Sequence, residues 1–179
     1  GEALSPAALP GALERTITID GLSKSFAMTG WRMGWAIAPG PAFGAIDRLQ
    51  SHSLTHSTSF AQYGAVAALQ GPQGSIAAMK AEFQARRDLI VAGLRRLPGV
   101  TCPEPMGAFY VFPRFDRRDW GNLRDEELAL DLLEKANIAV TAGSSFGARG
   151  QGHLRFSYAT SRERIAEGLE RLAAYQSGL

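Results

Sequence analysis

The order of apolar and polar residues predicts strands and helices that alternate along the chain. Residues 15–19 and 31–38 alternate apolar and polar side chains, which is the period of a half-buried strand. Residues 60–97 repeat apolar side chains every three or four positions, which indicates a long helix, and the segment Gly71–Gly74 interrupts it. Further strands are expected at 107–112, 138–140 and 152–160. The pattern therefore predicts an α/β fold.

Shorter helices and loops fill the rest of the pattern. Helices are expected at Ala42–Leu49, at 124–136 with Asn122 as its cap, and after the capping-box sequence Thr160–Glu163. Proline-rich, hydroxyl-rich or glycine-rich runs predict loops at 1–14, 51–59 and 142–152. Together these elements suggest three parts, residues 1–58, 59–97 and 98–179.

Composition excludes several classes of function. The 179 residues include 19 basic and 17 acidic side chains, and a net charge of +2 favours neither nucleic acid nor an anionic membrane as a partner. No apolar run approaches the roughly 20 residues of a membrane helix, and Cys102 is the only cysteine, which fits a reducing, cytoplasmic compartment. His52 and His56 have no third ligand nearby, so we expect no metal site.

The segment 21–35 contains the most reactive combination of side chains. Lys24 lies among small and apolar residues, and Arg32 follows eight positions later. A desolvated lysine amine is a nucleophile for carbonyls, and a guanidinium binds phosphate through two parallel hydrogen bonds. The pair therefore suits an aldehyde cofactor that carries a phosphate, although most Lys/Arg pairs are merely solvated surface residues.

The amino-acid sequence of this segment resembles that of a known protein family. Gly21, Ser23, Lys24 and Arg32 match the pyridoxal-phosphate (PLP) lysine signature of class I/II aminotransferases of PLP fold type I, and the run Met28–Arg32 is similar to the aspartate/prephenate-type branch. The resemblance implies that Lys24 is catalytic and forms the Schiff base with PLP. It also implies that Ser23 and Arg32 contact the cofactor, with Arg32 at the phosphate.

A second segment strengthens the resemblance. Within 152–160, Leu154, Phe156 and Tyr158 share one face of the expected strand, and Arg155 lies on the other. This run resembles the family's carboxylate-binding arginine segment, which implies that Arg155 binds the α-carboxylate of the substrate.

Three aromatic residues near these segments have two interpretations. Tyr110 belongs to a Gly-Ala-Phe-Tyr run that borders the substrate entrance in the resembled family, but core packing is the simpler interpretation. Trp31 and Trp35 lie on one face of the expected strand and suit either a stacking platform or the core, and we favour the core.

The resemblance implies the C-terminal part of a fold type I aminotransferase: the end of the large-domain sheet, a long linking helix and a small α/β domain. Such an enzyme transfers an amino group between an amino acid and a 2-oxo acid, and acts as a homodimer. The family's phosphate-binding turn, its aspartate at the pyridine nitrogen, and its asparagine and tyrosine at the ring oxygen have no counterpart here. We therefore expect the N-terminal half to be missing and these 179 residues alone to have little activity.

Two alternatives stay open from the sequence. A PLP-dependent C–S lyase or a related PLP enzyme would share Lys24, Arg32 and Arg155. An inactive C-terminal fragment that serves as an interaction domain would retain these residues without the chemistry.

Overall fold

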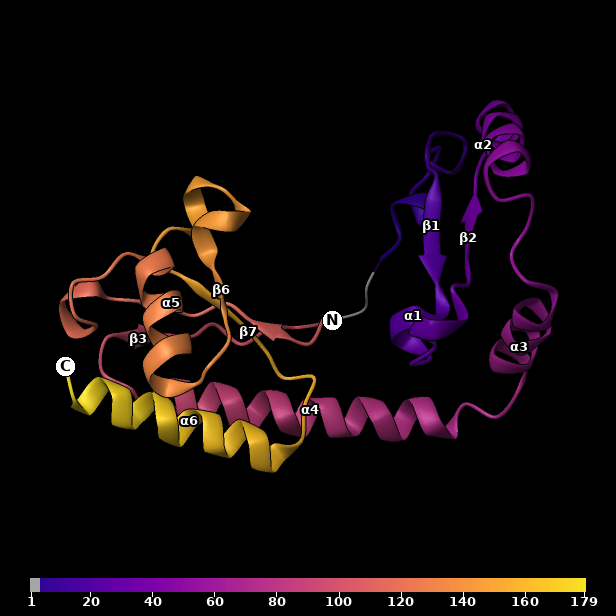
Figure 1. The fold of residues 1–179 in the computed structure, drawn as a ribbon. Helices are drawn as coiled ribbons and strands as arrows, with labels where there is room; N and C mark the ends of the chain where they lie inside the picture. Colours follow the sequence, from indigo (N-terminus) through magenta and orange to yellow (C-terminus); the bar gives the residue numbers. More distant parts are fainter. Residues whose placement is uncertain (1–3) are drawn as a thin grey trace. The chain divides into compact units, whose positions relative to one another are not determined.

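The computed structural model describes residues 4–179 and divides into two compact units (Figure 1). Unit 1 extends to Ala78, and unit 2 comprises Met79–Leu179. The first three residues of the predicted N-terminal loop lie outside the described residues. The three-part division expected from the sequence stays a prediction. The mixed α/β fold class is confirmed.

Unit 1 is built on a two-stranded antiparallel sheet. Strand β1 (Thr18–Gly21) pairs with β2 (Gly34–Ile37), and Gly21 lies opposite Gly34. A Cβ atom on Gly34 would lie 2.9 Å from the Asp20 carbonyl oxygen, so only glycine allows the two backbones this approach. The other elements of this unit are η1 (Pro6–Ala8), η2 (Leu13–Arg15), α1 (Leu22–Ser25), η3 (Thr29–Trp31), α2 (Gly40–Ser53) and α3 (Ser59–Gln70).

Unit 2 combines helices with two small antiparallel sheets. Helix α4 (Gly74–Leu94) begins in unit 1 and continues into unit 2, where α6 (Arg162–Ser177) lies beside it (Figure 1). One sheet has the order β4–β7–β6, and the other pairs β3 with β5. The remaining bounds are β3 (Val100–Thr101), β4 (Tyr110–Val111), β5 (Arg114–Phe115), η4 (Arg117–Asp119), α5 (Asp125–Ala136), β6 (Thr141–Ala142), η5 (Gly143–Phe146), η6 (Ala148–Gly150) and β7 (Leu154–Ser157).

Unit 2 has a continuous hydrophobic core. Leu94, Leu132, Leu154 and Leu172 come from α4, α5, β7 and α6, and each is at most 1% exposed. Trp120 is fully buried among them, and its indole N–H donates to the Pro98 carbonyl oxygen at 3.0 Å. Because each full burial of a large apolar side chain stabilises by about 1.5–3 kcal/mol, this cluster is the main source of stability in unit 2.

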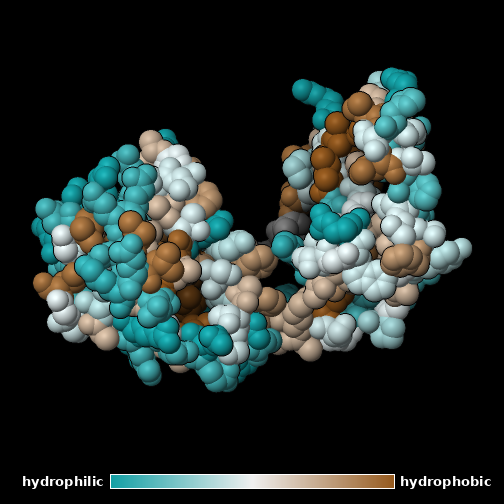
Figure 2. Space-filling model, viewed as in Figure 1, coloured by the Kyte–Doolittle hydropathy of each residue, from teal (hydrophilic) through white to brown (hydrophobic). Residues whose placement is uncertain are grey.

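Unit 1 has few buried side chains. Only Leu22, Ala61 and Ala65 form its buried apolar set among the described residues, and the two alanines are small. Ile19 is 79% exposed and Ile37 60% exposed on the two strands. Figure 2 shows hydrophobic side chains at the surface of this part of the chain. The apolar residues that predict strands and helices here are therefore mostly uncovered.

Several expected strands are shorter than the sequence pattern or displaced from it. The strand expected at 31–38 is confined to Gly34–Ile37, because Trp31 closes a 3₁₀ turn and Arg32 has left-handed backbone angles. The strand expected at 107–112 narrows to Tyr110–Val111. Residues 138–140 have no strand pairing, and pairing begins at Thr141. Apolar periodicity was wrong at these ends because it does not report where a hydrogen-bonding partner is present.

The core position that we favour for Trp31 is wrong. This side chain is 44% exposed, and its ring meets Phe60 of α3 edge-on at a centroid distance of 6.4 Å. Gly64 also lies against the Trp31 ring, since a Cβ atom there would come within 2.5 Å of it. Trp31 thus packs on α3 at the surface instead of filling a core.

The observed helices agree with the elements expected from the sequence better than the strands do. The long helix breaks as expected into α3 and α4, and α5 and α6 begin within a residue of the predicted starts. Asn122 is not the cap of α5, however. Arg124 occupies the cap position, and its backbone N–H donates to Glu127 Oε2 at 2.8 Å. Helix α2 also continues to Ser53, so the loop expected at 51–59 starts late.

Candidate active site

Ser23, Lys24 and Arg32, the residues that the sequence analysis predicts to contact a cofactor, line the same open hollow in unit 1. Its volume is about 420 Å³. The residues that line it are Asp20, Gly21, Ser23, Lys24, Ser25, Arg32, Met33 and Gly34. They come from the end of β1, from α1 and from the start of β2, so the strand pair and its two glycines determine the position of the hollow.

Leu22 fixes the start of α1 beside the strands. Its side chain is fully buried, and its backbone N–H donates to the Met33 carbonyl oxygen at 3.2 Å. Lys24 lies on the following turn with an exposed side chain. The buried leucine therefore anchors the short helix, and the lysine two residues later faces the hollow.

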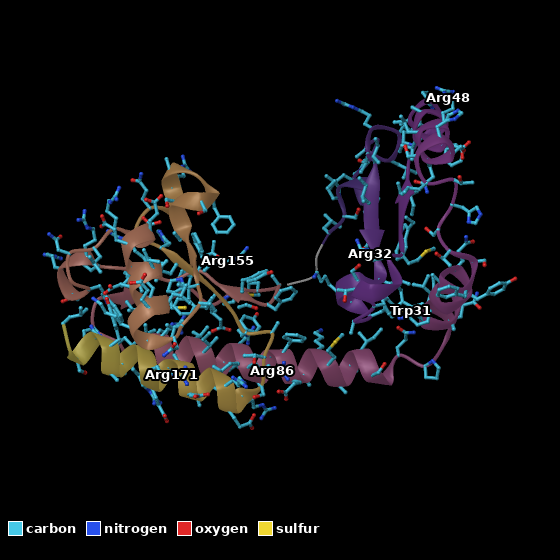
Figure 3. The ribbon with its side chains drawn as sticks, in the orientation of Figure 1. Trp31, Arg32, Arg48, Arg86, Arg155 and Arg171 are labelled. Atoms are coloured by element: carbon cyan, nitrogen blue, oxygen red, sulfur yellow. The ribbon has the colours of Figure 1, made fainter. Side chains whose placement is uncertain are left out.

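Arg32 reaches the same hollow through an unusual backbone conformation. Its φ of 51° is left-handed, a region that non-glycine residues rarely adopt and that is enriched at functional sites. The guanidinium donates from Nη1 to the Thr29 carbonyl oxygen at 2.9 Å. In Figure 3, Arg32 is labelled beside α1. The Arg32 side chain therefore reaches the hollow because the backbone turns at this residue, and not because Arg32 lies on one face of a strand.

The donor set of the hollow suits a phosphate-bearing aldehyde. It combines an amine, a guanidinium and the hydroxyls of Ser23 and Ser25, which are groups that bind an aldehyde carbon and phosphate oxygens. Asp20 adds one carboxylate, and its Oδ1 accepts from the Gly21 N–H at 2.7 Å. The sequence analysis missed Ser25 and Asp20 as lining residues, although their closeness to Lys24 in sequence was a usable signal.

Arg155 lies in unit 2, on the central strand β7. Its Nη2 donates to Thr141 Oγ1 at 3.3 Å across the β6–β7 pair. The guanidinium carbon lies 4.4 Å from the centre of the Tyr110 ring and 4.8 Å from that of Phe146. No ion pair between residues 4 and 179 includes Arg155. A half-buried guanidinium that contacts rings but no carboxylate is well suited to an external anion.

The core interpretation of Tyr110 is not confirmed, and its place at the substrate entrance stays a prediction. Its ring is half-buried and lies under the Arg155 guanidinium. Strand β4 pairs directly with β7 and places Tyr110 opposite Ser157, which lies on the same face of β7 as Arg155, so the ring and the arginine share one face of the sheet.

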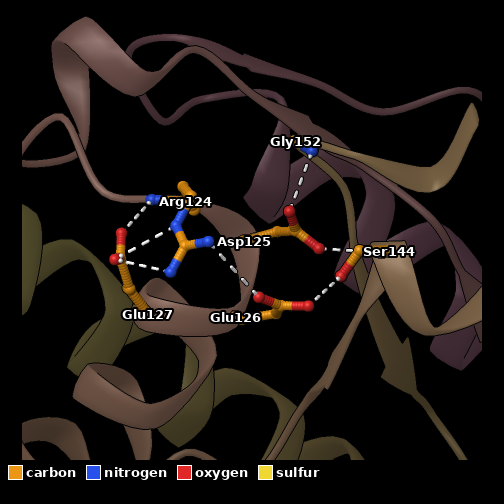
Figure 4. Close-up of polar contacts among 6 residues, drawn as sticks. All are labelled: Arg124, Asp125, Glu126, Glu127, Ser144 and Gly152. Carbon is orange, nitrogen blue, oxygen red and sulfur yellow. Dashed lines mark hydrogen bonds and ion pairs between the residues drawn. The ribbon is translucent and has the colours of Figure 1, made fainter. Parts of the chain in front are cut away.

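A buried carboxylate holds the loop that carries Phe146. Asp125, at the start of α5, is 7% exposed. Its Oδ2 accepts from the Ser144 backbone N–H at 2.7 Å, and its Oδ1 accepts from the Gly152 N–H at 3.3 Å (Figure 4). Burial raises the pKa of Asp125, but the hydrogen bonds from Ser144 and Gly152 lower it by more, so the net shift is downward. The sequence analysis missed this residue.

The described residues contain no metal-ligating cluster. Within 4–179, no three His, Cys, Asp or Glu side chains group together as a metal site would require. His52 lies in the last turn of α2, and the His56 ring contacts the Ser57 carbonyl oxygen at 2.8 Å. In the same part of the chain, every helix is too short or too polar to cross a bilayer.

Comparison with known proteins gives a consistent family. The model of aminotransferase class I and II matches residues 4–172. An aspartate/prephenate aminotransferase of Cereibacter sphaeroides is 42% identical over 177 residues, covering 95% of this chain and 44% of the relative. An aspartate aminotransferase of Pyrococcus horikoshii is 37% identical, with 90% of this chain and 41% of the relative covered.

Solved structures agree with the sequence relatives. An aromatic aminotransferase from Pyrococcus horikoshii superimposes with a TM-score of 0.93 at 38% identity, over 99% of this chain and 47% of that chain. An aspartate aminotransferase from Rhizobium meliloti gives a TM-score of 0.90 at 38% identity, over 98% and 45%. This chain therefore spans less than half the length of these relatives, and it belongs to the class I and II aminotransferase family.

Proposed function

We propose that this chain supplies the cofactor lysine and both anion-binding arginines of a PLP-dependent aminotransferase. Such an enzyme transfers an amino group between an amino acid and a 2-oxo acid. The observation that supports the proposal most strongly is that Lys24 and Arg32 line one hollow in a chain of this family. When bound, PLP supplies an electron sink for the negative charge that develops at the substrate α-carbon.

Lys24 has two roles in this proposal. Its amine would hold the aldehyde carbon of the cofactor, and it would move a proton to and from the substrate α-carbon. Both roles need an amine that is held near the cofactor yet is able to move. Lys24 meets this need because its side chain is exposed in the hollow while Leu22 anchors its helix.

Arg32 and Ser23 bind the phosphate end of the cofactor in this proposal. The Thr29 carbonyl oxygen already occupies one N–H of the guanidinium, which limits its rotation and leaves other donors for phosphate oxygens. The hydroxyl of Ser25 lies in the same hollow and is a further donor for this end.

Arg155 binds the α-carboxylate of the substrate. A guanidinium can accept a carboxylate through two parallel hydrogen bonds, provided that its plane is fixed. The Tyr110 and Phe146 rings and the Thr141 hydroxyl contact this guanidinium and restrict it. The names of the relatives favour aspartate or prephenate among the substrates. The homodimer stays a prediction from the family resemblance, and the cytoplasmic location stays a prediction from the single cysteine.

Replacement of Lys24 in the full-length enzyme tests the proposal. For Lys24→Ala we expect transamination to fall by about 10²–10⁴-fold or more, because the proton-transfer group is lost, together with the visible absorbance of bound PLP. Lys80→Ala is the matched control, since Lys80 is an exposed lysine on α4. Full transamination by Lys24→Ala defeats the proposal.

Product analysis separates the remaining activities. We expect the wild-type enzyme, given aspartate, glutamate or an aromatic amino acid with a 2-oxo acid, to form a new amino acid. Given an S-substituted cysteine instead, release of a thiol, pyruvate and ammonia without an amino-acid product would identify a C–S lyase. A preparation of residues 1–179 that takes up no added PLP would favour an inactive C-terminal fragment or interaction domain for this isolated chain.

A further inference from the structure

One carboxylate joins the two ends of a glycine-rich loop in unit 2. We call residues 143–152 the glycine loop. Asp125 accepts hydrogen bonds from the backbone N–H groups of Ser144 at 2.7 Å and of Gly152 at 3.3 Å, near the two ends of this loop. Asp125 is 7% exposed, so these contacts are largely shielded from water. Charge-assisted bonds in such surroundings are stronger than neutral ones.

The glycine loop itself has little freedom to change shape. A Cβ atom on Gly143 would lie 2.2 Å from the Gly150 carbonyl oxygen, and one on Gly150 would lie 1.9 Å from the Gly143 carbonyl oxygen. The backbone therefore closes tightly on itself at this point. With Asp125 binding Ser144 and Gly152, the loop is fixed both internally and to α5.

The glycine loop carries Phe146 onto the arginine of the proposed substrate site. The Phe146 ring lies 4.8 Å from the Arg155 guanidinium carbon. Phe146 also meets Phe112 edge-on at 5.9 Å, and Phe112 stacks on His153 at 5.0 Å. A change in the position of this loop would therefore alter the ring that contacts the guanidinium.

We propose that Asp125 is a positioning residue for substrate binding: by holding the glycine loop, it keeps Phe146 against Arg155 and so fixes the plane of the guanidinium. The inference rests on the proposed function of Arg155. Bidentate recognition depends on that plane, and a guanidinium oriented in advance loses less rotational freedom when a carboxylate binds.

Comparison of Asp125 with Glu127 separates two effects of an acidic residue in α5: positioning of the glycine loop and stabilisation of the helix N-terminus. Both acids lie in the first turn of α5 and both complement its N-terminus. Glu127, however, bonds only Arg124, through the backbone N–H at 2.8 Å and the guanidinium at 2.9 Å, and does not contact the glycine loop. Replacement of either acid by its amide removes one charge from the same helix end, but of these two acids Asp125 alone contacts the loop. Glu126, between them, also contacts it, since its Oε1 accepts from the Ser144 hydroxyl at 3.0 Å, but it does not reach Gly152.

Asp125→Asn in the full-length enzyme is the first test, with Glu127→Gln as the matched control. We expect Asp125→Asn to raise the KM for the amino acid about tenfold while kcat changes by less than about twofold, since a weakened charged hydrogen bond of this kind is worth roughly one factor of ten in binding. PLP uptake should not change. Glu127→Gln should leave KM, kcat and PLP uptake within about twofold of wild type.

Two further measurements keep the test decisive. Binding of an unreactive 2-methyl amino acid, followed by calorimetry, should weaken by the same factor as KM rises. Amide hydrogen exchange within the glycine loop should accelerate in Asp125→Asn and not in Glu127→Gln. If Asp125→Asn does not fold, Asp125→Glu keeps the charge but displaces the carboxylate, and we expect a smaller rise in KM with unchanged PLP uptake.

Arg155→Lys separates failure of this inference from failure of the proposed function. If Arg155→Lys weakens binding of the 2-methyl amino acid and the Asp125 variants do not, Arg155 has its proposed role and the positioning inference is overturned. If Arg155→Lys leaves binding unchanged, the proposed role of Arg155 fails. A fall in kcat with unchanged KM in the Asp125 variants also overturns the inference.

Discussion

Units 1 and 2 hold the residues of the proposed function in opposite ways. Unit 1 holds Lys24 and Arg32 in one hollow, but Leu22 is its only large side chain that is fully buried among the described residues. Unit 2 holds Arg155 above a continuous core that draws on α4, α5, β7 and α6. Lys24 and Arg32 thus lie in the unit that has the fewer buried side chains.

This difference shows that a local motif can position reactive groups without a core of its own. In unit 1 the hollow depends on close strand pairing at Gly21 and Gly34, on the buried Leu22 and on one left-handed residue, Arg32. In unit 2 the arginine depends on contacts between residues far apart in sequence, such as Asp125 with Gly152. Site geometry therefore depends on local contacts in unit 1 and on the packed core in unit 2.

The largest effect that we expect comes from separating the units. A polypeptide of residues 79–179 should unfold in one cooperative transition, because it contains the whole of the large buried cluster. A polypeptide of residues 4–78 should show no cooperative transition, because its strands and helices expose Ile19, Ile37 and Phe43. Urea titration followed by circular dichroism measures both. A sharp transition in 4–78 would remove the contrast between the units.

Matched leucine substitutions sharpen the comparison within helices. Leu132 in α5 is fully buried and Leu49 in α2 is 70% exposed. We expect Leu132→Ala to reduce the free energy of unfolding by about 2–5 kcal/mol, through lost burial and a residual cavity. Leu49→Ala should change it by no more than about 0.5 kcal/mol. Denaturant titration of the chain of residues 1–179, with amide exchange to assign each unit, provides the measurement. Equal reductions of the free energy of unfolding in Leu132→Ala and Leu49→Ala would contradict the difference in burial between the two leucines.

The smallest effect concerns acid stability in unit 2. The folded-state pKa of Asp125 lies below its unfolded value of about 3.9. Its ionised form therefore contributes stability that is present above that value and is lost as the pH falls through the folded pKa. In residues 79–179, Asp125→Asn should reduce the loss of stability that follows as the pH falls below about 4. Thermal melts at several pH values measure this loss, with Glu127→Gln compared in parallel; a slope identical to wild type would contradict the assignment.

The helices were largely predictable from sequence because their signals are local. The apolar repeat of residues 60–97, its break at Gly71–Gly74 and the capping-box sequence Thr160–Glu163 at the start of α6 each depend on residues within a few positions of one another, although the cap itself is Ser161 and not Thr160. Strands were predicted less well, since β4 and β6 extend only as far as β7 pairs with them. Periodicity indicates which face of a segment is apolar, but not whether a partner strand is present.

The sequence by itself determined which reactive groups this protein has. These are an amine at Lys24 and guanidinium groups at Arg32 and Arg155, in a pattern that is sufficient to indicate the family. The tertiary structure alone decided how these groups are held. It turned Arg32 into the hollow through a left-handed backbone, and it brought Asp125 to the glycine loop and Phe146 to Arg155. Residue types and spacing are written in the chain, whereas contacts between distant segments depend on packing that no local pattern records.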